Sequence, residues 1–250
     1  MINLKGKWSQ KKHIEFLKYL ESFADSKYKV FNCKLINDNS IEYIGVRTPI
    51  LRNIAKIIAH SDYKGFIKYN TGKYYEERAI QGFIIGYANV NYQELMEMIK
   101  DYIPFISNWA LTDMPIKKFK QIIENKDKAF EEILKFIKSD NPWEVRFGLV
   151  FLLNIYVEEK YISKILDICN SINIKHVCCT NSTIPYYVKM GNAWLISECY
   201  IKYPDLTEPF LRCKSLDAWT QNKAIQKIKD SLRVSNNEKR KVEYYKIIIY

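Results

Sequence analysis

Residues 106–113, with the sequence ISNWALTD, carry the side chains that are best suited to chemistry in this chain. Trp109 and Asp113 are four residues apart, so both lie on the same face if the segment is helical. With Ser107 as the N-cap, the two side chains would project from the first turns of one helix. An indole face can hold a planar or cationic ligand, and a carboxylate can stabilise developing positive charge. The pattern also fits a half-buried tryptophan beside a capping or solvated aspartate, and taken alone it favours that simpler interpretation.

The largely apolar segment 141–153 contains a single cation, Arg146. Because an unpaired buried charge is costly, we expect this arginine either to pair with a carboxylate or to face a cleft where it can bind phosphate. Asp113 is a candidate partner, and an adjacent guanidinium would keep its carboxylate ionised.

A second tryptophan, Trp194, lies in the segment 185–198, near one face of an expected helix together with Tyr187 and Gly191. The small residues Gly191 and Ala193 would let a neighbouring helix or another chain approach closely. Ordinary packing around a core tryptophan explains the same pattern, and this segment alone favours it.

The segment 45–52 is a candidate phosphate site. Thr48 is expected to cap a helix whose first residue is Pro49, with Arg47 and Arg52 beside the helix N-terminus. Free amides and the helix dipole at such a position attract an anion. Solvated arginines are the alternative, and the sequence leaves both open.

The segment 219–235 is a second candidate for contacts with phosphate. Lys223 and Lys227 are four residues apart, and Arg233 follows them. These cations would form a ridge along a nucleic-acid backbone. The alternative is the solvated face of an amphipathic helix, which is what a run of charges usually forms.

The composition indicates a folded, basic protein. The 250 residues are 48% hydrophobic and 27% charged, which is enough apolar material for a sizeable core. Lysine and arginine outnumber aspartate and glutamate by 39 to 28, and the net charge of +11 favours nucleic acid or an anionic membrane surface as a partner. The apolar runs are too short and too interrupted by charge to span a bilayer.

Cysteine and histidine usage argues against a metal site. Six cysteines without a CxxC spacing, and no recognisable signal peptide, are typical of a reduced cytosolic setting. Residues 176–179 (HVCC) offer metal ligands, but no second ligand cluster is visible, and buried thiols explain them better. We therefore expect neither a metal nor a cofactor.

The elements that must position these residues are helices. Eight glycines and seven prolines fall between periodic segments, and no strand alternation is visible. A string of helix pairs with short connections indicates a curved solenoid, although no strict repeat period is visible. An irregular polar stretch is expected over 28–43. Helices are predicted to begin near 48 and 107 and to cover 9–24, 61–69, 74–88, 91–103, 116–124, 127–138, 142–157, 161–172, 183–202, 206–211, 215–230 and 235 to the end.

Taken together, the segments resemble the AlkD family of bacterial DNA alkylation-repair glycosylases, which are built from HEAT-like repeats. The resemblance covers most of the chain. It implies a single all-α domain over residues 1–250, in which antiparallel helix pairs stack into a right-handed superhelix of the HEAT or ARM type. Its concave, basic surface would hold duplex DNA with alkylated bases. The resemblance rests on five stretches in order, namely GVRTP at 45–49 with Arg52, the pair Trp109 and Asp113, Arg146, residues 186–194 and residues 222–233.

The resemblance also implies roles for individual residues. Asp113 matches the family's catalytic carboxylate, Trp109 and Trp194 match its two cleft tryptophans, and Arg146 matches the arginine at the same cleft. Thr48 and Arg52 match positions that grip the DNA backbone. We predict a catalytic site of Asp113, Trp109, Trp194 and Arg146, and contacts with DNA from Arg47, Thr48, Arg52, Lys189, Lys223, Lys227 and Arg233.

The residue types suit release of N3- or N7-alkylpurines. An alkylated purine is already cationic and leaves as a neutral base, while the deoxyribose acquires oxocarbenium character that a carboxylate such as Asp113 stabilises. The same carboxylate can position water, and the indoles can meet cationic charge. The resemblance further implies that the lesion stays stacked in the duplex, without base flipping.

Departures from the family pattern support an alternative. Better-known members carry an arginine one turn after the second cleft tryptophan, where this chain has Ser197, and the residues before Tyr43 do not match clearly. A non-catalytic helical-repeat protein that binds DNA or RNA by shape and charge is the alternative function. A purely protein-binding solenoid is disfavoured by the net charge of +11. We expect a monomer in the bacterial cytosol.

Overall fold

The structure, a computed structural model, describes residues 2–116, 119–172 and 183–248. In these residues the chain forms α-helices and short 3-10 helices without any strand, and one isolated bridge pairs Glu42 with Tyr74. The prediction of an all-α, solenoid-like fold is confirmed. The chain divides into two compact units, unit 1 (Met1–Lys126) and unit 2 (Asp127–Tyr250). The right-handed superhelix and the single domain over residues 1–250 stay predictions.

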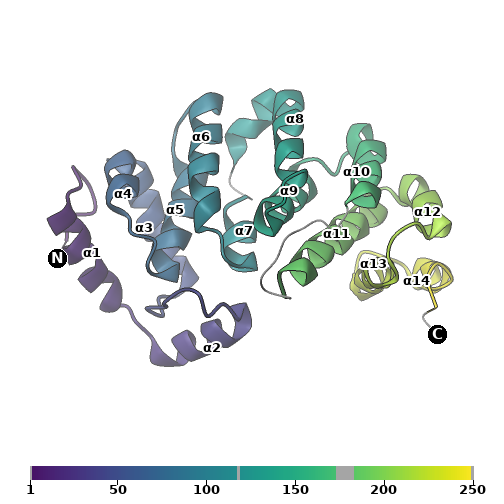
Figure 1. The fold of residues 1–250 in the computed structure, drawn as a ribbon, viewed down its shortest axis with the longest axis horizontal. Helices are drawn as coiled ribbons and strands as arrows, with labels where there is room; N and C mark the ends of the chain where they lie inside the picture. The colour runs from purple at the N-terminus through teal and green to yellow at the C-terminus, as the bar shows by residue number, and fades with distance from the viewer. Residues whose placement is uncertain (1, 117–118, 173–182, 249–250) are drawn as a thin grey trace. The chain divides into compact units, whose positions relative to one another are not determined.

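Unit 1 contains a row of three helices in which α5 lies between α3 and α7 (Figure 1). The neighbouring α4 packs against α3, and α6 packs against α5 and the two 3-10 helices. Helices that contact mainly their neighbours in the chain are typical of a solenoid. The elements are α1 (Gln10–Glu21), α2 (Ser26–Ile36), α3 (Thr48–Ala59), α4 (Tyr63–Tyr69), α5 (Tyr75–Tyr87), α6 (Tyr92–Tyr102), η1 (Ile103–Phe105), α7 (Trp109–Ile116) and η2 (Lys120–Asn125).

Unit 2 has a corresponding row in which α11 lies between α9 and α13 (Figure 1). The helices α10 and α12 pack against α11 and against each other, and α14 packs against α13. The elements are α8 (Lys126–Ile137), α9 (Pro142–Ile155), α10 (Glu159–Ser171), α11 (Thr183–Lys202), α12 (Pro204–Cys213), α13 (Ala218–Asp230) and α14 (Asn236–Glu243).

The helices of the two rows differ in how much of their surface is buried. On α3 the buried residues Leu51, Ile54, Ala55 and Ile58 follow the helical period and form one stripe. By contrast α5 and α9 are buried on nearly every side. Such helices form the centre of a core, so polar side chains on them need partners within the protein.

The expectation of an irregular stretch over residues 28–43 is wrong for its first part, because α2 covers Ser26–Ile36. Asp25 caps this helix by accepting a hydrogen bond from the Tyr28 N–H, and Asn37 ends it in the left-handed conformation. The apolar residues of α2 do not mark a buried stripe: Phe31 is 59% exposed. The periodicity that identifies most helices is therefore missing here.

Two other helix boundaries also differ from expectation. α3 begins at Thr48, so its N-cap is Arg47, which makes no side-chain capping bond, and Pro49 is the second helical residue. The helix expected over 116–124 is not one continuous α-helix. Residue 116 is the last of α7, η2 begins at Lys120, and residues 117 and 118 lie outside the described part.

None of the described helices combines the length and apolar character that crossing a bilayer requires.

Candidate functional site

The Trp109–Asp113 pair lies on α7, at the end of the row formed by α3, α5 and α7. Both side chains are half-buried, whereas Ala110, Leu111 and Thr112 between them are buried. The pair therefore occupies the accessible side of the helix, as the four-residue spacing predicts. An indole and a carboxylate are therefore on the same side of α7.

Asn108, not Ser107, caps α7. The side-chain oxygen of Asn108 accepts a hydrogen bond from the Leu111 N–H at 3.1 Å, and the helix begins at Trp109. The hydroxyl of Ser107 instead donates to Asp38 at 2.6 Å. The cap satisfies an N–H group of the first turn and so fixes the point at which Trp109 enters the helix.

Asp38 holds the loop in front of α7 from the turn that follows α2. Its Oδ2 accepts hydrogen bonds from Ser107 Oγ at 2.6 Å and from Asn108 Nδ2 at 2.9 Å, while its Oδ1 accepts from Ser40. Burial alone would raise the pKa of Asp38, but these hydrogen bonds to the charged form outweigh burial and lower the pKa. At neutral pH the loop is therefore held by a carboxylate.

Arg78 holds the same loop from α5. Its guanidinium donates to the backbone oxygen of Phe105 at 3.1 Å and to Ser107 Oγ at 3.3 Å. Asp38, Arg78, Ser107 and Asn108 thus form one hydrogen-bonded group, called the α7 anchor below. Because charge-assisted hydrogen bonds are stronger and more directional than neutral ones, this group orients the helix that carries the tryptophan and the carboxylate.

Arg47 and Thr48, two predicted contacts with DNA, lie at the start of α3 beside α2. Arg47 forms an ion pair with Asp25 at 2.7 Å, and its guanidinium lies 5.2 Å from the ring centroid of Tyr28. The Tyr28 hydroxyl is 3.3 Å from Thr48 Oγ1. The Arg47 side chain remains 59% exposed, so it can also reach a ligand.

The turn before α3 is fixed by a buried carboxylate that the sequence did not reveal. Glu76, on α5, accepts hydrogen bonds from the N–H groups of Ile44 at 2.9 Å, Gly45 at 2.7 Å and Val46 at 3.1 Å. Gly45 has a φ of 101°, and a side chain there would also meet Lys29. The glycine is therefore required by both the turn and the packing.

Arg52 lies further along α3 and faces α5. Its guanidinium is 4.3 Å from the ring centroid of Phe83, within the range of a cation–π interaction. The side chain is half-buried, so its charge is partly accessible on the row.

Arg146 is buried on α9, with 4% of its surface exposed. Its Nη1 donates to the backbone oxygen of Tyr187 on α11 at 2.7 Å, and the guanidinium lies 5.8 Å from the Tyr187 ring centroid. A side-chain carbon added to Gly191 would stand 3.7 Å from the same Nη1. The arginine thus packs along α11, and a backbone carbonyl is one partner that the sequence did not predict.

Lys227, on α13, lies 5.8 Å from the ring centroid of Trp194 on α11. Its pKa is lowered, first by burial and then by repulsion from Lys223 and Arg146. The nearby acidic groups, Asp230 and Glu198, offset this only in part. Cations of α9 and α13 therefore create a region of positive potential around an indole of α11, which favours an anion.

Lys189 lies on α11 and Arg233 follows α13, but each has a carboxylate partner. Lys189 is 3.1 Å from Asp217, and Arg233 is 2.7 Å from Glu198. A phosphate would have to share or replace these partners. The charges of Lys189 and Arg233 are therefore partly neutralised within the protein.

Ser197, which departs from the family pattern, faces the protein interior. It is 1% exposed, and its hydroxyl donates to the backbone oxygen of Trp194 at 2.7 Å. It supplies no charge beside the indole.

The predicted site residues all lie on the two rows or directly beside them. In unit 1 Trp109 and Asp113 share the accessible side of α7, and in unit 2 Arg146 and Lys227 lie close to α11. The pairing of Asp113 with Arg146 stays a prediction. Thr48 and Arg52 are on α3, Trp109 and Asp113 on α7, Arg146 on α9, Lys189 and Trp194 on α11, and Lys223 and Lys227 on α13, with Arg47 before α3 and Arg233 after α13.

Within the described residues, no three histidine, cysteine or acidic side chains are grouped in a way that could hold a metal ion. The segment 176–179 lies outside the described part.

These features define a class of protein, namely an all-α, solenoid-like chain with two rows of helices. Each row carries a tryptophan and cationic side chains, and the row of unit 1 also carries the carboxylate of Asp113. Residues 16–228 match the model of the DNA alkylation repair enzyme family, and the chain belongs to this family. Its role is in DNA repair, as the resemblance implied, and the matched range includes residues of both units. Searches of the curated proteins and of the solved structures find no match.

Proposed function

We propose that the chain is a monofunctional DNA N-glycosylase that releases N3- or N7-alkylated purines from duplex DNA. The observation that carries the proposal is the presentation of Trp109 and Asp113 on the accessible side of α7, in a member of a DNA alkylation repair family. The proposed reaction needs no metal and no cofactor.

Asp113 acts on the sugar in this proposal. As the bond between C1′ and the purine nitrogen breaks, its electron pair goes to the cationic base, which leaves neutral. The deoxyribose gains positive charge, which the Asp113 carboxylate stabilises. Water then attacks C1′ and loses its proton to solvent or to the carboxylate, so that an abasic site remains.

The tryptophans act on the alkylated nucleotide. The face of Trp109 can attract the cationic purine before it leaves, because an indole is the most effective aromatic partner for a cation. Trp194 would contact the same nucleotide from α11, where Lys227 lies beside its indole and, with Arg146, supplies positive charge for the flanking phosphates. Thr48 and Arg52 would contact the DNA backbone from α3.

The test is release of free base from duplex DNA that contains 7-methylguanine. The native chain should release the base, and Asp113→Asn should lower the single-turnover rate by on the order of 100-fold or more, the usual effect of removing one electrostatic stabiliser. Asp101→Asn is the matched control, because Asp101 is an exposed carboxylate on α6. If Asp113→Asn retained the native rate, the carboxylate's assigned role would be wrong.

A second candidate function is non-catalytic binding of DNA or RNA. The observation in its favour is Ser197, which is buried and supplies no charge beside Trp194. Salt-sensitive binding of duplex DNA without any base release by the native chain would select this function.

A further inference from the structure

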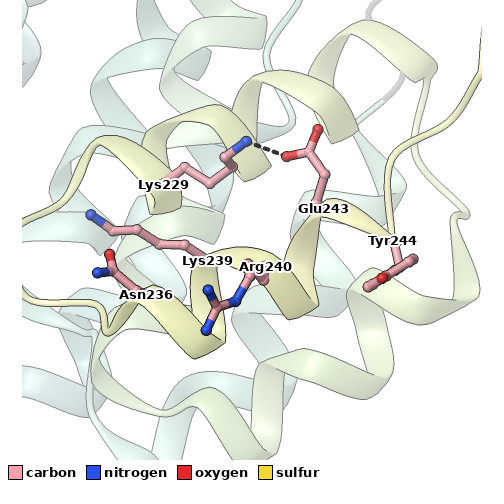
Figure 2. Close-up of a pocket in the computed structure, with 6 residues that line it drawn as sticks. All are labelled: Lys229, Asn236, Lys239, Arg240, Glu243 and Tyr244. Carbon is pink, nitrogen blue, oxygen red and sulfur yellow. Dashed lines mark hydrogen bonds and ion pairs between the residues drawn. The ribbon is translucent and has the colours of Figure 1, made fainter.

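A second basic site lies at the end of unit 2, between α13 and α14. A cavity of about 550 Å³ opens there, and Figure 2 shows the side chains around it. It is lined by Lys229, Asn236, Lys239, Arg240, Glu243 and Tyr244.

Five of the six lining residues belong to one face of α14 and its end. Starting from Asn236, the others follow at three, four, seven and eight residues, which is the spacing of a single helix face. Lys229 approaches from α13 (Figure 2). The spacing therefore puts two cations, an amide, a carboxylate and a phenol ring on one broad face of the helix and its end.

The charge of the cavity is positive after its acidic neighbours are accounted for. Glu243 is ion-paired with Lys229 and with Lys246, the latter at 2.5 Å, and these partners lower its pKa. In the same region, Glu238 accepts hydrogen bonds from Ser235. The nearby carboxylates are thus occupied.

Lys239 and Arg240 are the cations left for a ligand. Arg240 donates to the Asn237 amide oxygen, which is neutral, and within the described residues neither cation forms an ion pair with a carboxylate. Tyr244 is 81% exposed at the rim, where its ring can contact a planar group.

The cavity is separate from the proposed DNA contacts on α13. Lys229 follows Lys227 by two residues, which places it about 200° around the helix axis, on the opposite side. All six lining residues also come after residue 228, where the family match ends. The matched range of the family therefore does not include this site.

We propose that this cavity binds a nucleoside phosphate unit, with the phosphate at Lys239 and Arg240 and the base against Tyr244. The fork of an arginine and the point charge of a lysine suit phosphate oxygens, and an exposed phenol ring suits a base of any sequence. The unit belongs either to a nucleic-acid strand or to a free nucleotide. The inference does not rest on base excision.

The first test is protection of lysines from acylation in the full chain, measured residue by residue by mass spectrometry. The probes are inorganic phosphate, thymidine monophosphate and an oligothymidylate of eight nucleotides. We expect the two nucleotide probes to protect Lys239 by about threefold or more while leaving Lys11, exposed on α1, unchanged. Stronger protection by the oligonucleotide would indicate a strand, and equal protection a free nucleotide. Protection by inorganic phosphate alone, or by no probe, would overturn the proposal.

The second test uses charge-reversal variants. Lys239→Glu/Arg240→Glu should weaken binding of the oligonucleotide about tenfold at low salt, because two phosphate contacts are lost. The control Lys11→Glu/Lys18→Glu changes the net charge equally on exposed residues of α1. Equal weakening in both variants would show a general effect of charge and would also overturn the proposal. Base release from 7-methylguanine DNA is measured in parallel, so failure of the glycosylase proposal is seen separately.

Discussion

Asp38 accepts hydrogen bonds from two consecutive residues of the loop before α7, and the second of these is the helix cap. Asp38 would therefore affect the proposed reaction by fixing the position of α7, which carries Asp113. A carboxylate that must lie beside C1′ loses much of its effect when it is displaced by about 1 Å, which costs on the order of 100-fold in rate. The α7 anchor supplies the rigidity that a short helix lacks by itself.

We predict that Asp38→Ala slows base release about tenfold or more while changing the affinity for duplex DNA little. The substitution leaves the amide of Asn108, which is 1% exposed, without this acceptor and should lower the free energy of unfolding by about 1–3 kcal/mol. Single-turnover rates, DNA titrations and urea unfolding measure the three quantities. Ser40→Ala is the control, because Ser40 binds the other oxygen of the same carboxylate. Equal losses of rate and affinity would contradict a positioning role.

The sequence predicted the shared face of Trp109 and Asp113 because that relation is local. It did not predict the anchor, since Asp38 and Ser107 are 69 residues apart and Arg78 and Ser107 are 29 apart. Glu76 was missed for the same reason. An acidic residue in an apolar helix indicates that a partner is needed, but not which backbone amides supply it.

At the scale of helices, two glycines should respond oppositely to alanine. A side-chain carbon at Gly82 on α5 would lie 2.7 Å from both Pro115 of α7 and the Tyr102 hydroxyl, whereas at Gly191 its nearest neighbour, Leu149, is at 3.6 Å. We predict that Gly82→Ala lowers the free energy of unfolding by about 1–3 kcal/mol. Gly191→Ala should raise it by about 0.5–1 kcal/mol, through helix propensity.

Urea unfolding of the two variants measures this difference, and each serves as the control for the other because both add one methyl group within a helix. The Tyr102 hydroxyl donates to the backbone oxygen of Leu111 in α7 at 2.9 Å. Displacement of Tyr102 in Gly82→Ala should therefore also disturb α7. A stabilised Gly82→Ala would show that the packing of α5 against α7 is looser than the structure indicates.

A helix could be predicted where signals within its own sequence mark it, and not where it depends on contacts that are distant in sequence. The start of α9 was predicted because Asn141 caps it and Pro142 follows, both local signals. The helix α2 was missed because its buried residues are only Asn32 and Ile36, so its sequence lacks an apolar stripe. The sequence predicted a solenoid of packed helices but not the two rows. The choice of neighbouring helices depends on contacts between residues that are distant in sequence.

At the scale of the whole molecule, the net charge of +11 favours association with a polyanion such as DNA, and this attraction weakens as salt is added. Cations that contact phosphate release counterions from the duplex, and each contributes about 0.9 to the slope of log K against log salt. Cations that already have a carboxylate partner contribute less. The net charge therefore does not measure the number of contacts, and individual lysines must be compared.

Lys227 and Lys160 provide that comparison. Lys227 lies on α13 beside Trp194, where burial and then repulsion from Lys223 and Arg146 lower its pKa. Lys160 lies on α10, outside the row, and pairs with Asp127 at 2.7 Å. Each substitution to methionine removes one positive charge and keeps an apolar stem, so long-range effects on the field are matched. We predict that Lys227→Met lowers the slope by about 1 and that Lys160→Met leaves it unchanged, in titrations of duplex DNA at several salt concentrations. If both variants lowered the slope equally, binding would depend on overall charge, and the assignment of Lys227 to a phosphate contact would be wrong.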